Sequence, residues 1–145
     1  MSLEDLVARA AAVPGALGAV LCDFEGEAVL TQLGSTPVPA AMLEGAKSQI
    51  PARLSHIGSP ADFLLRLAGA EPCALLALFG QRSEALGGGT LEALELGFAR
   101  VQLLVTRLPE DYYLVMVLDR TVSGGFARAR RVAAELHPAL CREVG

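Results

Sequence analysis

The chain has 145 residues, a net charge of −4 and an apolar fraction of 52%. This length is enough for one domain with its own hydrophobic core. The overall charge lacks the basic excess that nucleic-acid binding needs, so no nucleic-acid partner is expected. No stretch reaches the roughly 18 uninterrupted apolar residues of a membrane helix. The amino terminus is acidic (Glu4, Asp5) rather than basic like a secretory signal, which indicates a cytoplasmic protein without membrane insertion.

Residues that usually carry catalysis or bind metals are few and scattered. Cys22, Cys73 and Cys141 lie far apart in the sequence, which favours buried free thiols over disulfides or a zinc site. His56 and His137 have no cysteine or serine nucleophile assigned to them by spacing, and no carboxylate pair is placed for acid–base chemistry. We therefore expect no enzymatic activity, no cofactor and no metal.

The first third of the chain predicts a helix followed by a hairpin. Ser2 is placed to cap a helix that extends to about Val13. Two short strands then follow at residues 16–23 and 28–33, joined by a turn in which Gly26 supplies a positive φ.

The region from residue 35 to residue 70 is less regular and contains four prolines. Residues 40–50 have helical composition, and Ser59 followed by Pro60 is a good helix start for an apolar segment at 62–68. We expect one or two short helices here, because the segment is too small for a core of its own.

A longer helix is predicted for residues 71–86, with Pro72 near its start. Its first half, residues 73–79, is apolar on every side, so every side must be covered. In a domain this small the sheet can cover only one face. The other face needs the preceding segment or a second copy of the chain.

Residues 91–96 allow two interpretations. Their composition favours a helix capped by Thr90, but six residues between glycines make a poor helix, so we prefer a strand ending at Gly97. Residues 101–108 and 112–118 then predict two antiparallel strands around a short polar break. The second of these is apolar at nearly every position, which is typical of a central strand covered on both faces.

A final helix is predicted from about Gly125 to Glu143, with Pro138 bending or ending it. The order is therefore α-β-β-(helical segment)-α-β-β-β-α, an α/β (α+β) fold in a single domain of residues 1–145.

This order and three local segments resemble the Roadblock family, named for the roadblock-type dynein light chains. The three segments are Pro14–Gly26, Val101–Asp119 and Ser123–Arg128. Within the family, residues 107–115 are most similar to bacterial polarity regulators of the MglC and MglB type. The resemblance implies a five-stranded antiparallel sheet between a middle helix on one face and the two terminal helices on the other. It does not extend to residues 35–70, which are longer than the usual connection, so the middle helix starts either at Glu71 or near Pro60.

Roadblock proteins usually form homodimers by pairing their third strands and packing their middle helices together. The resemblance therefore implies a non-enzymatic adaptor or regulator that binds itself and a Ras-like small GTPase or another Roadblock protein, in polarity or motility control. The expected interface residues lie on one side of the middle helix and on the strand after it. They are Leu75, Leu78, Phe79, Arg82, Leu94, Glu95 and Leu96.

Two further possibilities remain open from the sequence. Arg128 and Arg131 follow the Gly124-Gly125 helix start, where they form either a solvated basic face or a contact for acidic residues of a partner. Alternatively to the adaptor function, residues 35–70 would wall a pocket in a small-molecule sensor of the profilin-like or PAS-like kind.

Overall fold

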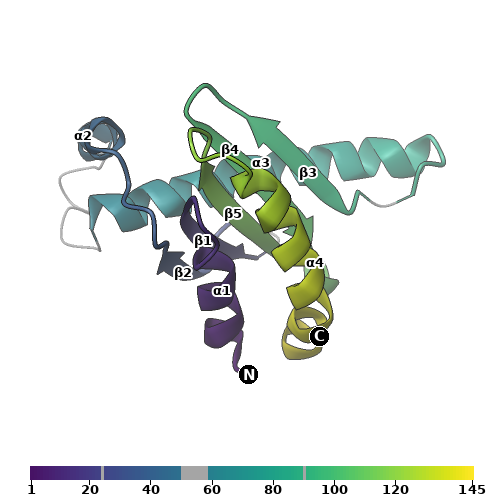
Figure 1. Ribbon diagram of the computed structural model, residues 1–145. Coiled ribbons are helices and arrows are strands. Elements are labelled where there is room, and N and C mark those ends of the chain that lie inside the picture. The colour runs from purple at the N-terminus through teal and green to yellow at the C-terminus, as the bar shows by residue number, and fades with distance from the viewer. Residues whose placement is uncertain (24, 50–58, 90) are drawn as a thin grey trace.

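The computed structural model of the chain describes residues 1–23, 25–49, 59–89 and 91–145 (Figure 1). Its helices and strands follow the predicted order. They are α1 (Leu3–Ala11), β1 (Ala16–Cys22), β2 (Ala28–Leu33), α2 (Ala40–Gln49), α3 (Pro60–Ala85), β3 (Ala93–Gly97), β4 (Val101–Arg107), β5 (Tyr113–Asp119) and α4 (Gly125–Val144). A short 3-10 turn, η2 (Pro109–Asp111), joins β4 to β5.

The five strands form one antiparallel sheet in the order β2-β1-β5-β4-β3. The predicted central strand is confirmed, because β5 is buried at every residue except Asp119. Tyr112 and Tyr113 pack on opposite faces of this sheet, as the alternation along a strand requires. The segment at 91–96, for which a helix was the alternative, contains the strand β3, which pairs with β4 in the register Leu94↔Val105.

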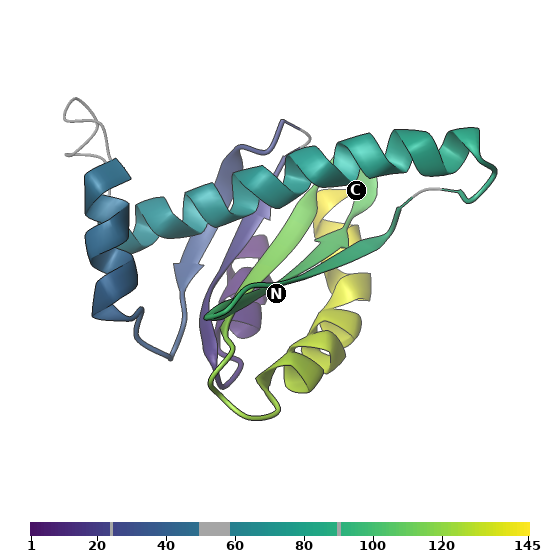
Figure 2. The ribbon, with the colours of Figure 1, turned by 90° about the horizontal axis from the view of Figure 1, so that it is seen from above.

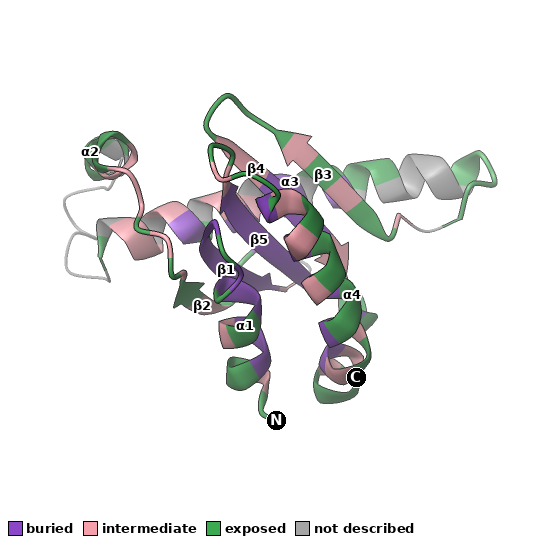
Figure 3. Ribbon diagram, in the orientation of Figure 1, coloured by how far each residue is buried: buried purple, intermediate pink, exposed green. Residues whose placement is uncertain are grey.

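Helices cover both faces of the sheet, α3 on one and α1 with α4 on the other (Figure 2). The core is therefore divided into two layers, and the most buried ribbon belongs to β1 and β5 (Figure 3). Leu21 and Met116 face the layer under α1 and α4. Val20 and Val115 face the layer under α3. This is the arrangement that the resemblance implied.

The start of α1 and the course of α4 past its proline can both be explained from their residues. At the start of α1, the Asp5 N–H donates to Ser2 Oγ at 3.2 Å and the Ser2 N–H donates to Asp5 Oδ2 at 3.0 Å, so the predicted cap is confirmed. These bonds from Ser2 lower the pKa of the Asp5 carboxyl. The helix α4 runs from Gly125 to Val144, close to its predicted bounds, so Pro138 does not end it. Pro138 and Ala134, whose carbonyl loses its partner, are both exposed, so water can satisfy that carbonyl.

The middle helix starts near Pro60, which decides between the two alternatives for its start. A separate short helix at 62–68 and a new helix from Glu71 were expected, but α3 is continuous through Pro72. An internal proline costs about 3 kcal/mol in an isolated helix. Here Pro72 is buried, and each buried leucine such as Leu65 or Leu76 contributes about 1.5–3 kcal/mol, which offsets that cost.

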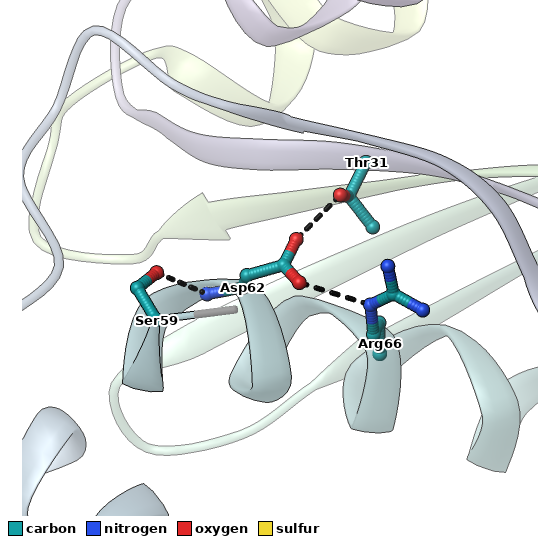
Figure 4. A network of polar contacts seen from close by, with 4 residues as sticks. All are labelled: Thr31, Ser59, Asp62 and Arg66. Carbon is teal, nitrogen blue, oxygen red and sulfur yellow. Dashed lines mark hydrogen bonds and ion pairs between the residues drawn. The ribbon is translucent and has the colours of Figure 1, made fainter. Parts of the chain in front are cut away.

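A network of polar contacts holds the first turn of α3 on the edge strand β2 (Figure 4). The Asp62 N–H donates to Ser59 Oγ at 3.1 Å, which confirms Ser59 as the predicted cap. The Thr31 hydroxyl donates to Asp62 Oδ1, and Arg66 Nε donates to Asp62 Oδ2 at 2.9 Å. One carboxylate therefore joins the helix start to a strand that lies about thirty residues earlier in the sequence.

Between β2 and α3, the predicted helix at 40–50 is present as α2, and residues 50–58 lie outside the described part of the chain. No helix formed by the described residues combines the length and apolarity that a crossing of the lipid bilayer requires.

Candidate functional site

The outward side of α3 carries a stripe of large apolar residues. Leu75, Leu78 and Phe79 are 39%, 46% and 44% exposed, and we call these three residues the α3 outer face. Cys73 and Leu76, in the same turns of the helix, are turned to the sheet and buried. These three residues follow the three- and four-residue spacing of one side of a helix. Arg82 continues this spacing along α3, but its side chain lies outside what the structure describes.

The α3 outer face is exposed because its three side chains lie on the side of α3 opposite to the buried Cys73 and Leu76. Both views show the carboxyl-terminal end of α3 extending past the strands (Figures 1 and 2). Leu76 is the last residue of α3 in the buried core formed by the described residues. The sequence of α3 remains apolar through Phe79.

The edge strand β3 presents different residues on its two sides. Leu94 and Leu96 are half-buried on the same face of the sheet as α3. Glu95 points to the opposite face, where its carboxylate lies 3.2 Å from Nε of Arg130 on α4. The expected interface residues of β3 therefore do not form one patch. Leu94 and Leu96 share a face with α3, whereas Glu95 ties the edge to α4.

Sequence reasoning did not single out the exposed apolar residues next to these elements. Leu86 directly follows α3 and is 89% exposed, and Phe98 lies in the turn between β3 and β4 and is 52% exposed. A large aromatic residue in a short turn is unusual, so Phe98 could have been recognised from its position. Val29 and Leu33 are exposed on the other edge strand, β2.

The arginine side chains at the start of α4 extend toward two different parts of the molecule. Arg130 stacks on Phe126 at 4.8 Å and reaches Glu95. Arg128 and Arg131 instead line a hollow of about 260 Å³ between α1 and α4, together with Arg9. Arg9 was missed because nothing in the sequence brings the end of α1 next to the start of α4.

His137 and Cys141 lie next to each other on α4, a contact that the sequence analysis did not single out. Cys141 Sγ lies 3.6 Å from Nδ1 and 3.7 Å from Nε2 of His137. A sulfur aligned with the lone pair of one ring nitrogen would be much farther from the other nitrogen. This nearly equal spacing therefore indicates packing against the ring rather than an activated nucleophile.

Cys22 on β1 and Cys73 on α3 are free buried thiols in the same core layer, as expected for buried cysteines. A hydrogen bond between the two thiols raises the pKa of Cys22, with burial as the next cause, and lowers the pKa of Cys73. The described residues include no group of three or more His, Cys, Asp or Glu side chains placed to hold a metal ion.

The alternative of a pocket walled by residues 35–70 is not tested, because residues 50–58 lie outside the described chain. A second hollow, of about 290 Å³, lies between β3 and α4 beside Ala93, Ala133 and His137, away from that segment.

No family model and no curated protein matches this sequence. Solved structures do match it over nearly the whole chain. The gliding protein MglB of Thermus thermophilus has a TM-score of 0.67 at 18% identity, covering 96% of this chain and 85% of that one. MglC of Myxococcus xanthus has a TM-score of 0.56 at 23% identity, covering 99% of both chains. A Roadblock/LC7 domain of Streptomyces avermitilis has a TM-score of 0.57 at 16% identity, covering 97% of this chain and 98% of that one. The chain therefore has the Roadblock/LC7 fold, with a structure that resembles those of MglB and MglC.

Proposed function

We propose that this chain is a non-enzymatic adaptor or regulator that self-associates and binds a Ras-like small GTPase or another Roadblock protein. The observation that carries the proposal is the α3 outer face, where Leu75, Leu78 and Phe79 are exposed at the three- and four-residue spacing of one side of a helix. Single exposed apolar residues are ordinary, but a contiguous group on one helix marks a binding surface.

Self-association would use the α3 outer face together with the β3 edge. Each of the three side chains is already partly covered, so complete burial would add roughly half of the 1.5–3 kcal/mol that a fully exposed residue would gain. Association itself costs about 4–15 kcal/mol in lost freedom of motion. The helix surface alone is therefore insufficient, and pairing of β3 with β3 of a second copy would supply the backbone hydrogen bonds that an edge strand lacks.

A role in polarity or motility is supported by the likeness to a gliding protein and to MglC, and by the expectation from residues 107–115. In this function the sheet is the scaffold, and the partner contacts the surface that two copies present together.

Light scattering on purified protein at micromolar concentration tests the self-association. The chain should have twice the mass of one copy, and the double variant Leu78→Glu/Phe79→Glu should be a monomer with an unchanged circular dichroism spectrum. The matched control is Val29→Glu/Leu33→Glu, which introduces the same charge at similarly exposed residues of β2. A monomeric wild type, or loss of the dimer only in the β2 variant, would contradict the proposed interface.

Binding of a GTPase is tested separately with purified small GTPases and Roadblock proteins from the same cell, each GTPase loaded with GDP and with a GTP analogue. Retention of one of them by the wild-type chain supports the adaptor function. Failure to bind every one of them in both nucleotide states would contradict it and would leave the self-association result unaffected.

A further inference from the structure

The hollow between α1 and α4 is lined by three arginines and one carboxylate. Arg9 comes from the last turn of α1, and Arg128 and Arg131 come from the first two turns of α4. Glu135 is the only acid among the lining residues. Its carboxylate is 4.0 Å from Arg131 Nε, and both side chains are more than half exposed, so this ion pair neutralises little of the charge. We call this hollow the arginine cleft.

Arg128 is held in the cleft by neutral groups. Its Nη2 donates to the carbonyl oxygens of Ser123 at 3.1 Å and of Pro14 at 3.5 Å. Carbonyl oxygens orient a guanidinium group without cancelling its charge. Nε of Arg128 is buried and has no hydrogen-bond partner among the described residues. Because this atom is buried, contacts to a ligand fall to the other nitrogens of the cleft's guanidinium groups.

The placement of the two cleft arginines of α4, Arg128 and Arg131, opposes the dipole of that helix. The amino-terminal end of a helix favours acidic side chains, but the first turn of α4 has none, and two arginines of the cleft lie in its first two turns. The chain as a whole carries a net charge of −4, so this local positive charge is not a general property of its surface. An arrangement that costs stability in the free protein is well suited to an anion that arrives from outside.

We propose that the arginine cleft binds acidic side chains of a partner protein. The lining of the cleft also includes Val13, Pro14 and Val132, which suit the aliphatic part of a glutamate, while the guanidinium groups suit its carboxylate. The cleft is open, and its volume of about 260 Å³ is below the range usual for small-molecule sites, which favours an acidic segment over an enclosed small ligand. This site is separate from the α3 outer face and does not depend on the proposed self-association.

The test measures binding of a fluorescently labelled octaglutamate peptide by anisotropy at low salt, with octaglutamine as the neutral probe. The variant Arg9→Gln/Arg131→Gln removes two charges and leaves Arg128 and its carbonyl contacts in place. The matched control Arg100→Gln/Arg142→Gln removes the same charge at exposed residues outside the cleft. We expect the cleft variant to weaken octaglutamate binding by roughly tenfold and the control variant by less than about twofold.

Equal weakening by both variants would overturn the proposal, because it would assign the binding to overall charge. Complete displacement of octaglutamate by a few millimolar inorganic phosphate would also overturn it, in favour of a free oxyanion site. Amide shifts in nuclear magnetic resonance spectra give an independent result: octaglutamate should shift residues 9–14 and 123–135, and shifts confined to other regions would contradict the cleft. Light scattering on the cleft variant should give the same mass as the wild type, so this result is independent of the self-association test.

Discussion

The hydroxyl of Thr31 on β2 donates a hydrogen bond to the carboxylate of Asp62 in the first turn of α3. This bond ties an edge strand to the helix that carries the α3 outer face. The same carboxylate also accepts a hydrogen bond from Arg66, so Asp62 holds the first turn of α3 in its orientation on the sheet. The same helix that carries the candidate interface is therefore tied to the sheet edge at its first turn.

Replacing Thr31 with valine keeps the shape of the side chain but removes this bond. Because the acceptor is a charged group that is only partly exposed, we expect the free energy of unfolding to fall by about 1–2 kcal/mol. Urea denaturation followed by circular dichroism measures the change. Thr106→Val is the control, since the Thr106 hydroxyl on β4 has no hydrogen-bond partner among the residues described here. A loss in the control as large as that in Thr31→Val would show that the strand, and not the bond to Asp62, is responsible.

At Gly18 the strand β1 and the helix α3 approach each other closely. A Cβ atom there would lie 2.6 Å from Leu65 Cδ1 and 2.8 Å from the backbone oxygen of Gln32. The leucine could move but the strand backbone could not, so Gly18→Ala should destabilise the protein by roughly 1–3 kcal/mol. Thermal unfolding measures this. Gly45→Ala in α2 is the opposite case, with nothing within 4 Å of the new Cβ, and should stabilise the helix by roughly 0.5–1 kcal/mol. Equal stability of the wild type and Gly18→Ala would refute the tight contact.

The sheet could be predicted because its signals are local. Residues 101–118 contain two apolar runs around Pro109. In the structure these runs form β4 and β5, which pair with each other inside the sheet. The prediction of a strand at β3 is confirmed although the residues have helix propensity, because the glycines around them leave too little length for a helix. Ser2 and Ser59 were found for the same reason, since a cap depends on only four neighbouring residues.

The parts that could not be predicted depend on contacts between distant residues. Pro72 ends a helix by local rules, yet α3 passes through it because the sheet buries the residues on both sides. Arg9 and Arg128 are more than a hundred residues apart in the sequence, so no spacing rule could place them in one cleft. Likewise, the face of the sheet to which the Glu95 side chain points depends on the register of β3, and only the pairing of β3 with β4 fixes that register.

The three cysteines should react with a thiol reagent at very different rates. Cys22 and Cys73 are 0% and 2% exposed, and their mutual hydrogen bond holds the Cys22 thiol in its protonated form, whereas Cys141 is half-exposed. Since only an accessible thiolate attacks the reagent, native protein should release one equivalent of thionitrobenzoate quickly and all three only in denaturant. The variant Cys141→Ser should show no fast phase. A fast phase that persists in this variant would mean that α3 opens from β1 readily.

Stability at alkaline pH should be limited in part by Tyr113. Burial, with Asp111 as the next cause, raises the pKa of this phenol above its ordinary value of 10.0. As the pH rises past about 10, the unfolded chain therefore releases the phenolic proton before the folded chain does, so stability present below that pH is lost as the pH rises through the folded pKa. Urea denaturation at pH 8, 10 and 11 should show a smaller loss in Tyr113→Phe than in the wild type. Tyr112→Phe, which alters the neighbouring half-buried phenol, is the control. Parallel losses in the wild type and Tyr113→Phe would assign the alkaline instability to other groups, such as the Cys22–Cys73 thiols.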